Sequence, residues 1–471
     1  MTEYSLVSLF SGAGGMDLGF RMSGGFNLLL ANDILSPAAL SYAENFGHTV
    51  VDVSDFNQGR DIHRPVYVLG DVSELDFTRV SNQVDIVVGG PPCQDFSVVR
   101  GAEKERQGIK VKRGQLYAHY IRALIYLQPK IFVFENVPGL KSANKGVAYK
   151  SIVGDFSRLR LSWEEIKRII GNNVQDKVRN YVIVFSDIVD SAYLGAPQRR
   201  KRLIIIGVRE DLVNKNWIKI SRIEREARAV LQGENSIFVK YPLTPLEVFE
   251  GRTLPEVQNE YAEIMEKYKN IGKILSTENA QKWVVGVWNK LSFNVIEDYL
   301  LVNRIKKAEY KELETAFEKH SDILKELGYY KDKLQGKIFP DHSNIIPKEV
   351  NSVLERLKMI PPDGNHDFVR DTEWKVEGRG ISLIYRRLHP LKPSYTVVAY
   401  GGGGTWGYHY ERHRGKLTNR ERARLQTFPD NFLFSGSSAE VRARIGEAVP
   451  PLLGKRIAQF AKAILDEELH G

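Results

Sequence analysis

The sequence predicts an α/β fold whose first part is a mostly parallel sheet covered by helices on both faces. Short apolar runs rich in β-branched and aromatic residues recur between residues 4 and 208, and stretches of helical length such as 36–46 and 114–127 separate them. This alternation is typical of parallel sheets, which bind ligands at the carboxyl ends of their strands. The predicted strands are Tyr4–Phe10, Phe26–Ala31, Val66–Leu69, Val84–Val88, Ile131–Phe134, Val182–Phe185 and Leu203–Val208.

The composition is that of a globular protein with more than one domain. The chain has 471 residues and a formal net charge of +9, which permits a polyanionic partner. A single cysteine excludes an intramolecular disulfide framework and a multi-cysteine metal site, so we expect no metal. No apolar run approaches the roughly 18–20 residues that a membrane-spanning helix needs, and the N-terminus lacks a basic leader. We therefore expect a cytoplasmic protein without a membrane partner.

The turn after the first strand contains Gly12 and Gly14, which allow a ligand to approach backbone N–H groups at a helix start. A strand–helix turn that binds nothing has the same composition. Asp33 ends the second run, where a carboxylate can bind ribose hydroxyls, and Asp71 ends the third, where it could meet an adenine edge. These acids together predict an adenosine-containing cofactor. The register of the glycines departs from G-x-G-x-x-G, which disfavours NAD.

The fourth run leads into GGPPC at 89–93, which holds the only cysteine of the chain. A lone thiol is commonly a buried structural residue. Two preceding prolines and a position at the end of a strand instead favour Cys93 as a nucleophile held in fixed geometry.

Glu135 ends the fifth run, where its carboxyl group can act as an acid–base residue or bind loop amides. Four consecutive cations precede the last run. In strand geometry Arg200 and Arg202 share one face, and Arg199 and Lys201 share the other. One pair could face the active site and the other a core acid or the solvent.

Beyond residue 208 the alternation of strands ends and the pattern becomes more helical. The segment 301–340 predicts an amphipathic helix with a solvated charged face. From about 366 to 424 arginines and aromatic residues are interleaved, which suits contacts with a nucleic-acid backbone, although about half of the aromatics belong to a core. An apolar-periodic helix over 445–467 ends the chain.

Taken in order, these blocks resemble the DNA (cytosine-5) methyltransferases of the restriction–modification type. The resemblance covers residues 4–208 and about 386–465 and leaves the middle of the chain unmatched. The matching blocks are SLFSGAGGMDLGF at 8–20, GGPPCQDFS at 89–97, ENVPG at 135–139, QRRKRLIIIG at 198–207, LTNRERARLQTFPDNF at 417–432 and IGEAVP at 445–450.

The resemblance implies a Rossmann-like catalytic domain with a smaller target-recognition domain, and S-adenosylmethionine as the methyl donor. Cys93 would attack carbon 6 of a cytosine flipped out of double-stranded DNA, and Glu135 would bind its N3 edge. Arg202 would contact the base, and Arg200 would support it at a neighbouring phosphate. Gln94 and Thr396 would contact DNA. The implied cofactor contacts are Phe10, Gly12, Gly14, Asp33, Asp71, Pro91, Glu447 and Val449.

Two of these positions depart from the family pattern. Asp33 stands where glutamate is usual, and Glu447 stands where asparagine is common. The implied domains are a catalytic domain at 1–208, a target-recognition domain at 209–385, a DNA-contacting segment at 386–444 and a helix at 445–471 that returns to the catalytic domain.

The leading hypothesis is an enzyme that methylates cytosine within a short DNA sequence and protects host DNA from a restriction endonuclease, without required contact with it. We expect a monomer. A tRNA cytosine methyltransferase is the nearest alternative, but the roughly 175 unmatched residues favour DNA. A non-catalytic DNA-binding protein would not need a rigid thiol. A nicotinamide dehydrogenase would need a G-x-G-x-x-G turn, which is absent.

Overall fold

The structure is a computed structural model that describes residues 3–59, 65–80, 83–92, 114–170, 178–213, 217–376, 384–399 and 407–469. The chain divides into two compact units. Unit 1 comprises residues 1–190, 201–235 and 449–471, and unit 2 comprises residues 191–200 and 236–448. The predicted boundary between residues 208 and 209 lies inside unit 1, and the division of function among the predicted domains stays a prediction.

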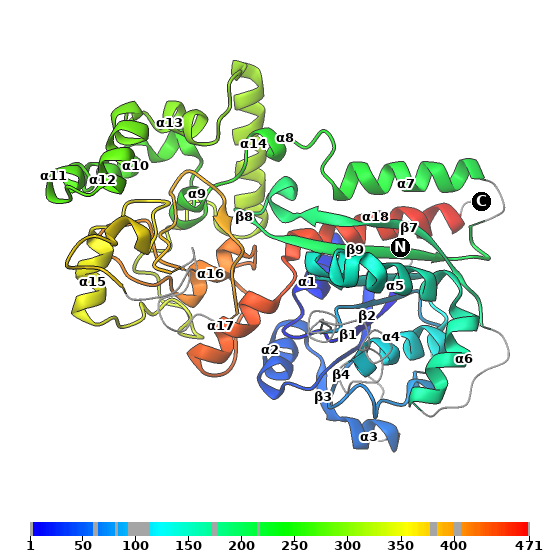
Figure 1. The fold of residues 1–471 in the computed structure, drawn as a ribbon. Helices are drawn as coiled ribbons and strands as arrows, with labels where there is room; N and C mark the ends of the chain where they lie inside the picture. The colour runs from blue at the N-terminus through cyan, green and yellow to red at the C-terminus, as the bar shows by residue number, and fades with distance from the viewer. Residues whose placement is uncertain are drawn as a thin grey trace. The chain divides into compact units, whose positions relative to one another are not determined.

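Unit 1 contains an eight-stranded sheet in the order β3-β4-β2-β1-β5-β6-β9-β7 (Figure 1). All neighbouring strands are parallel except at β9, which is antiparallel to both β6 and β7. The α/β prediction and its seven strands are confirmed, whereas β3 was missed because it is short and exposed. The strands are β1 Tyr4–Leu9, β2 Phe26–Asp33, β3 Thr49–Asp52, β4 Val66–Leu69, β5 Ile86–Gly89, β6 Ile131–Asn136, β7 Tyr181–Asp190 and β9 Lys201–Arg209.

The order of the strands reverses at β1, which pairs with β2 on one side and with β5 on the other. In open α/β sheets, ligands bind outside the carboxyl ends of the strands at this point of reversal. The loops that follow β1 and β5 contain the glycine turn and the GGPP segment, so the topology brings these two segments of the sequence to one place.

Helices cover both faces of the sheet, as the period of two along each strand requires. On β2, Leu30 packs into the core shared with α4, α5 and α6, whereas its neighbour Ala31 packs with Tyr42 of α2 on the opposite face. The predicted helices 36–46 and 114–127 are confirmed. The helices of unit 1 are α1 Gly15–Ser23, α2 Ser36–Phe46, α3 Val53–Asn57, α4 Gly114–Leu127, α5 Val147–Ser157, α6 Leu159–Ile170, α7 Trp217–Leu231 and α18 Pro451–Leu469.

The last helix, α18, packs closely against α1. A Cβ atom on Gly19 would lie 2.3 Å from the backbone nitrogen of Lys455, so only glycine permits this approach. The Tyr4 hydroxyl also donates a 2.8 Å hydrogen bond to Asp466. The prediction of one helix over 445–467 is wrong, because α17 (Ser438–Glu447) ends before Pro450 and a new helix begins at Pro451.

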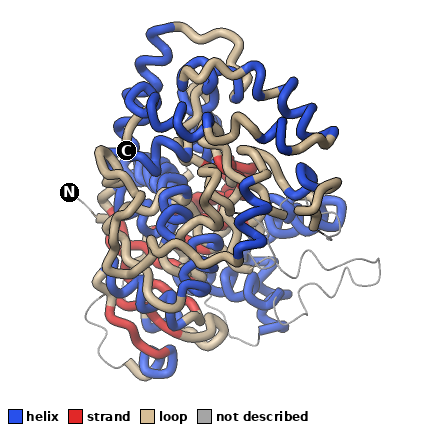
Figure 2. Tube along the Cα trace, turned by 90° about the vertical axis from the view of Figure 1, so that its left-hand side faces the viewer, coloured by secondary structure: helices blue, strands red, loops and turns tan. Residues whose placement is uncertain are grey.

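Unit 2 is built mainly of short helices and loops. Figure 2 shows that helices and loops make up most of the trace of the chain. Its two short strands, β8 (Gln198–Arg199) and β10 (Ser394–Tyr395), pair in parallel. Of the segment 301–340, only α14 and the last two residues of α13 are helical. The helices are α8 Ile237–Lys240, α9 Pro245–Glu250, α10 Gln258–Glu266, α11 Ile271–Ile274, α12 Glu278–Gly286, α13 Val295–Val302, α14 Tyr310–Glu326, α15 Asn351–Lys358, α16 Asn419–Leu425 and α17, with 3-10 turns that include η7 Trp288–Lys290 and η8 His366–Val369.

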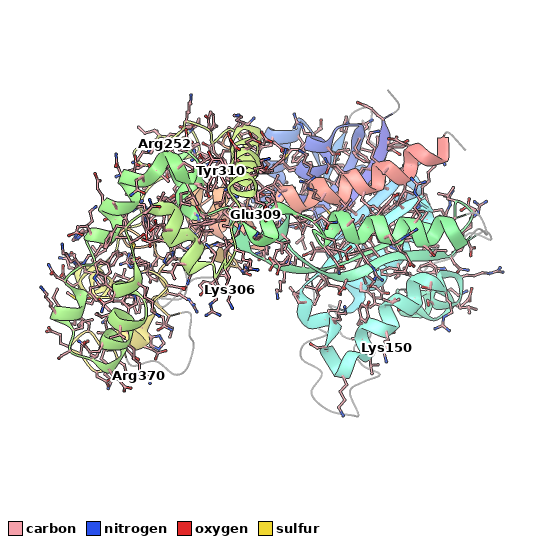
Figure 3. The ribbon with its side chains drawn as sticks, turned by 90° about the horizontal axis from the view of Figure 1, so that it is seen from above. Lys150, Arg252, Lys306, Glu309, Tyr310 and Arg370 are labelled. Carbon is pink, nitrogen blue, oxygen red and sulfur yellow. The ribbon has the colours of Figure 1, made fainter. Side chains whose placement is uncertain are left out.

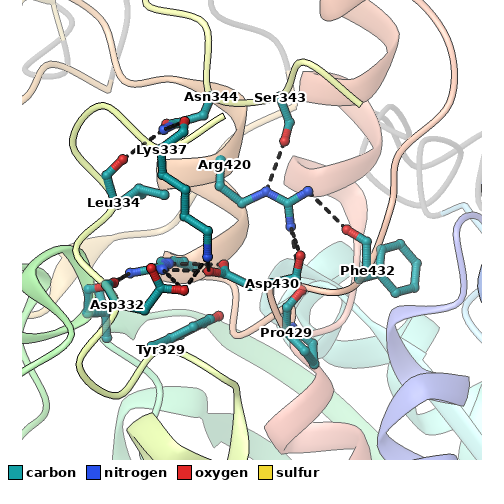
Figure 4. Close-up of polar contacts among 12 residues, drawn as sticks. Tyr329, Asp332, Leu334, Lys337, Ser343, Asn344, Arg420, Pro429, Asp430 and Phe432 are labelled. Carbon is teal, nitrogen blue, oxygen red and sulfur yellow. Dashed lines mark hydrogen bonds and ion pairs between the residues drawn. The ribbon is translucent and has the colours of Figure 1, made fainter. Parts of the chain in front are cut away.

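A buried polar network surrounds α16 (Figure 4). Arg420 binds the Asp341 carboxylate at 2.7 Å, the Ser343 hydroxyl at 2.9 Å and the Phe432 carbonyl at 3.0 Å. Arg424 binds both carboxylate oxygens of Asp430. Because both guanidinium groups are fully buried, these arginines of the 417–432 block stabilise unit 2.

None of the helices in the described part of the chain is long and apolar enough to cross a membrane.

Asp17 is a buried carboxyl group in the first turn of α1, with a side-chain exposure of 1%. Burial raises the pKa of Asp17 to about 7, and the neighbouring hydroxyls of Ser8 and Tyr42 offset part of this rise. The folded state therefore binds a proton that the unfolded chain has already lost.

We predict that Gly19→Ala lowers the free energy of unfolding by about 1–3 kcal/mol or more, because the new methyl group overlaps the backbone of α18. Urea unfolding of the two proteins measures the difference. Gly139→Ala is the matched control, since a Cβ atom there meets nothing within 4 Å. Equal losses in both variants would contradict the packing argument.

We predict that Asp17→Asn stabilises the protein progressively as the pH rises from about 4 to 7. The pKa of Asp17 is raised on folding, so wild-type stability falls through this window by up to about 1.4 kcal/mol per pH unit, because the unfolded chain loses the Asp17 proton while the folded state still holds it. The variant lacks this loss. The free energy of unfolding of both proteins, measured at several pH values, tests this prediction. A difference in that free energy that stays constant from pH 4 to 7 would refute it.

Candidate active site

The turn after β1 adopts an unusual backbone conformation. Phe10, Gly12 and Gly14 have φ angles of 55°, 54° and 86°, in the left-handed region. The turn ends at Gly14, the N-cap residue of α1. Glycine adopts this conformation without steric cost at two of the three positions. Phe10 adopts it at a steric cost and is half-buried.

The two glycines of this turn serve different purposes. A Cβ atom on Gly14 would lie 2.7 Å from the rings of Tyr42 and Phe46, so glycine is needed for packing. A Cβ atom on Gly12 would meet nothing within 4 Å, so this peptide borders open space. The Tyr67 hydroxyl donates to the Gly12 carbonyl at 3.2 Å and fixes the peptide beside that space.

Asp33 lies next to this turn at the end of β2. Its carboxylate accepts hydrogen bonds from the backbone N–H of Gly12 at 3.0 Å and of Leu35 at 3.2 Å. Burial raises the pKa of Asp33, and these backbone donors lower it in part. The fold thus brings Asp33, the residue predicted to bind the ribose hydroxyls, next to the glycine turn.

Asp71 lies beyond the end of β4 and accepts a 2.8 Å hydrogen bond from the Ser73 backbone N–H. The buried Asn32 side chain links β2 to this segment, donating to the carbonyls of Val68 at 2.8 Å and Gly70 at 3.1 Å. Asn32 was not predicted from the sequence, although a polar residue at the end of an apolar run was a usable signal.

The open space at Gly12, with carboxylates at the ends of β2 and β4, fits the adenosine cofactor that the family resemblance implies. Phe10, Gly12, Gly14, Asp33 and Asp71 would hold it. The buried Pro91 follows β5, on the other side of the point where the strand order reverses. In the described residues there is no group of three or more His, Cys, Asp or Glu side chains that could hold a metal ion.

The loop after β5 lies directly against Glu135. A Cβ atom on Gly90 would be 2.6 Å from the Glu135 carboxylate, so the absence of a side chain allows this approach. The buried amide of Asn136 donates to the Pro91 carbonyl at 3.0 Å. The loop is therefore tied to the end of β6 two residues before Cys93. Cys93 and Gln94 themselves lie outside the described residues.

Glu135 forms an ion pair with Arg202, with 2.8 Å between Oε1 and Nε. The antiparallel register pairs Glu135 with Ile204 of β9, which places Arg202 at the carboxyl edge of the parallel strands. The two side chains are 13% and 12% exposed. This edge of unit 1 thus holds a carboxylate that is oriented by a guanidinium and lies against the GGPP loop.

Arg200 lies in unit 2 and is fully buried. Its guanidinium donates to the backbone carbonyls of Val397 at 2.9 Å, Gly446 at 2.7 Å and Glu447 at 3.2 Å. The expected phosphate contact of Arg200 is not supported, because these carbonyls bind the guanidinium. Its neighbours Arg199 and Lys201 are exposed, and Arg200 itself lies between β8 and β9.

The remaining predicted site residues are divided between the units. Thr396 lies in unit 2, where its hydroxyl donates to the Arg199 carbonyl at 2.8 Å. Glu447 is exposed in unit 2, and Val449 is buried in unit 1.

Part of the basic and aromatic stretch is buried. Arg387 is fully buried and donates to the carbonyls of Ile360 at 2.9 Å and Leu357 at 2.6 Å. Tyr408 and Tyr410 are also buried. These residues belong to the core of unit 2.

Known proteins similar to this chain share its full length. A relative from Aeropyrum pernix, DNA (cytosine-5-)-methyltransferase M.ApeKI, is 54% identical over 99% of this chain and 100% of its own. Type II methyltransferase M.NgoFVII of Neisseria gonorrhoeae is 30% identical over 98% of this chain and 86% of its own.

A crystal structure described as a candidate DNA modification methyltransferase encoded within an E. coli prophage has a similar fold. Its TM-score is 0.55 at 20% identity, over 98% of this chain and 100% of that one. The C-5 cytosine-specific DNA methylase family matches residues 4–463. On this match, and on the relative that is 54% identical over its whole length, the chain belongs to the C-5 cytosine-specific DNA methylase family.

Proposed function

We propose that this protein methylates carbon 5 of a cytosine that is flipped out of double-stranded DNA within a short target sequence, as the modification enzyme of a type II restriction–modification pair. The observation that carries the proposal is the Glu135 carboxylate, paired with Arg202 and packed against Gly90. Relatives named as type II methyltransferases support the restriction context. Contact with the endonuclease is not required, and the enzyme acts as a monomer in the cytoplasm.

The enzyme uses S-adenosylmethionine, which supplies the methyl group as an electrophile when bound. Glu135 holds a proton at N3 of the cytosine ring, which favours addition of the Cys93 thiolate to carbon 6. Carbon 5 gains nucleophilic character from this addition and would accept the methyl group, whose bond to the sulfur of the donor would break. Loss of the carbon-5 proton and release of the Cys93 thiolate restore the aromatic ring.

Arg202 has two tasks in this scheme. It orients the Glu135 carboxylate, and its cationic group faces negative charge that develops at the carbonyl oxygen of the base. Phe10, Gly12, Gly14, Asp33, Asp71 and Pro91 are proposed to bind the methyl donor, joined by Glu447 and Val449. Gln94 and Thr396 are proposed to contact DNA. Arg200 is proposed to act indirectly, by fixing the segments that contain Val397 and Glu447.

Bisulfite sequencing of host DNA after expression of the wild-type protein and of Cys93→Ser tests the proposal. We expect protected cytosines in one recurring short sequence with the wild-type protein and none with the variant, because serine is a much weaker nucleophile. Protection that persists in Cys93→Ser would refute the role of the thiol. Protected cytosines in small RNAs, and none in DNA, would identify an RNA substrate instead.

We predict that Glu135→Gln slows methyl transfer about 100-fold or more, because the amide cannot hold the proton at N3. Single-turnover measurements with saturating DNA and methyl donor isolate this step. Glu74→Gln, which removes an exposed carboxylate from the same unit, should leave the rate unchanged. A rate for Glu135→Gln close to that of the control would return Glu135 to a structural role.

A further inference from the structure

Unit 2 contains a cavity of about 650 Å³ that the proposed mechanism does not use. It lies between α12, η7, the end of α13 and two loops, 361–368 and 386–392. All these segments belong to unit 2, so its lining does not depend on unit 1.

The walls of the cavity are rigid and partly apolar. Trp283 packs against Trp288, with ring centroids 5.4 Å apart, and edge-on against Phe368. Val287 and Leu301 line the cavity with exposed side chains. Surfaces of this kind suit the sugar rings of a nucleic-acid backbone as well as other apolar groups.

The acidic group at the base of the cavity is already neutralised. Asp363 binds Lys392 at 2.7 Å, Arg386 at 3.4 Å and the Tyr395 hydroxyl at 2.8 Å. Burial raises the pKa of Asp363, but the charge of Lys392 and these hydrogen bonds outweigh burial and hold the pKa well below its usual range. Asp367, the other acid in the lining, forms an ion pair with Arg370.

Two further cations line the cavity and have no such partner. Lys290 and Arg304 are exposed, and neither side chain makes an ion pair or hydrogen bond with any residue that the structure describes. Arg304 also has a φ angle of 58°, where glycine or asparagine is favoured. Lys306, two positions further on, is exposed and is not part of the lining (Figure 3).

Two amide side chains of the lining are held by the backbone of one residue. Asn279 donates to the Asp367 carbonyl at 2.9 Å, and Asn365 accepts from the Asp367 N–H at 3.0 Å. The cations of the lining can neutralise phosphates, and such contacts do not distinguish base sequences.

We propose that this cavity binds a phosphate group of the DNA backbone through Lys290 and Arg304. The proposal rests on the proposed function, which makes DNA the substrate. In this proposal the cavity raises the affinity of the protein for DNA, and other residues of the chain select the target sequence.

The test is the salt dependence of DNA binding by the full-length protein and by Lys290→Gln/Arg304→Gln. Each phosphate neutralised contributes about 0.9 to the slope of log K against log salt, so loss of this one phosphate contact should make the slope of the double variant shallower by about 0.9. Bisulfite sequencing should find the same methylated sequence with both proteins, because no base contact is removed.

The matched control is Lys311→Gln/Lys319→Gln, which removes the same charge from α14, whose first residue, the exposed Tyr310, is labelled in Figure 3. Neither control lysine lines the cavity, so the wild-type slope should be retained. An unchanged slope in Lys290→Gln/Arg304→Gln, or a slope changed equally in the control, overturns the proposal. A changed methylated sequence overturns it as well, because the cavity would then read bases.

A second arm distinguishes DNA from free phosphate. The unfolding temperatures of the wild-type protein and the double variant are measured with and without millimolar inorganic phosphate. We expect phosphate to change both temperatures by the same amount. Stabilisation by phosphate that the double variant loses, with an unchanged DNA slope, would assign the cavity to a free anion and overturn the proposal. If the wild-type protein methylates no DNA, the proposed function itself fails; if it does, only the role of the cavity is in question.

Discussion

The ion pair between Glu135 and Arg202 sets the arrangement at the ligand-binding edge of the sheet. Each side chain is little exposed, and burial of either charge without the other would be strongly unfavourable. The pair explains the direction of β9. A strand antiparallel to its neighbours begins at the edge where they end, so a cation at its start meets a carboxylate at the end of β6. Gly90 completes the arrangement, because any side chain would displace that carboxylate.

Strand positions in unit 1 were predictable because each buried strand leaves a short β-branched or aromatic run. The direction of β9 was not, since periodicity is the same in both directions. The break before Pro451 was signalled by adjacent prolines and still missed. Glu135 at a strand end could be read from sequence, whereas the ties made by Asn32 and Asn136 depend on carbonyls that only the fold brings within reach.

Arg200 shows why the number of basic residues is a poor measure of the charge that can contact DNA. Unit 2 has long loops and little sheet, so many backbone carbonyls have no partner in a helix or strand ladder. A guanidinium offers five N–H donors in one plane and can satisfy several carbonyls at once. Arg200, Arg387, Arg420 and Arg424 are fully buried in this way. The basic composition therefore overstates the charge available to DNA, because part of it replaces regular hydrogen bonding inside the protein.

The packing of α18 against α1 has a consequence for synthesis on the ribosome. Residues from the two ends of the chain meet here, and the Tyr4–Asp466 hydrogen bond spans 462 positions. Contacts so distant in sequence form late and slow folding. The segments of unit 2 lie between segments of unit 1 in the sequence. Unit 2 can therefore fold while unit 1 still lacks α18. Unit 1, whose sheet carries Glu135, is completed only after α18 has been translated, and a chain that ended before α18 would lack a finished unit 1.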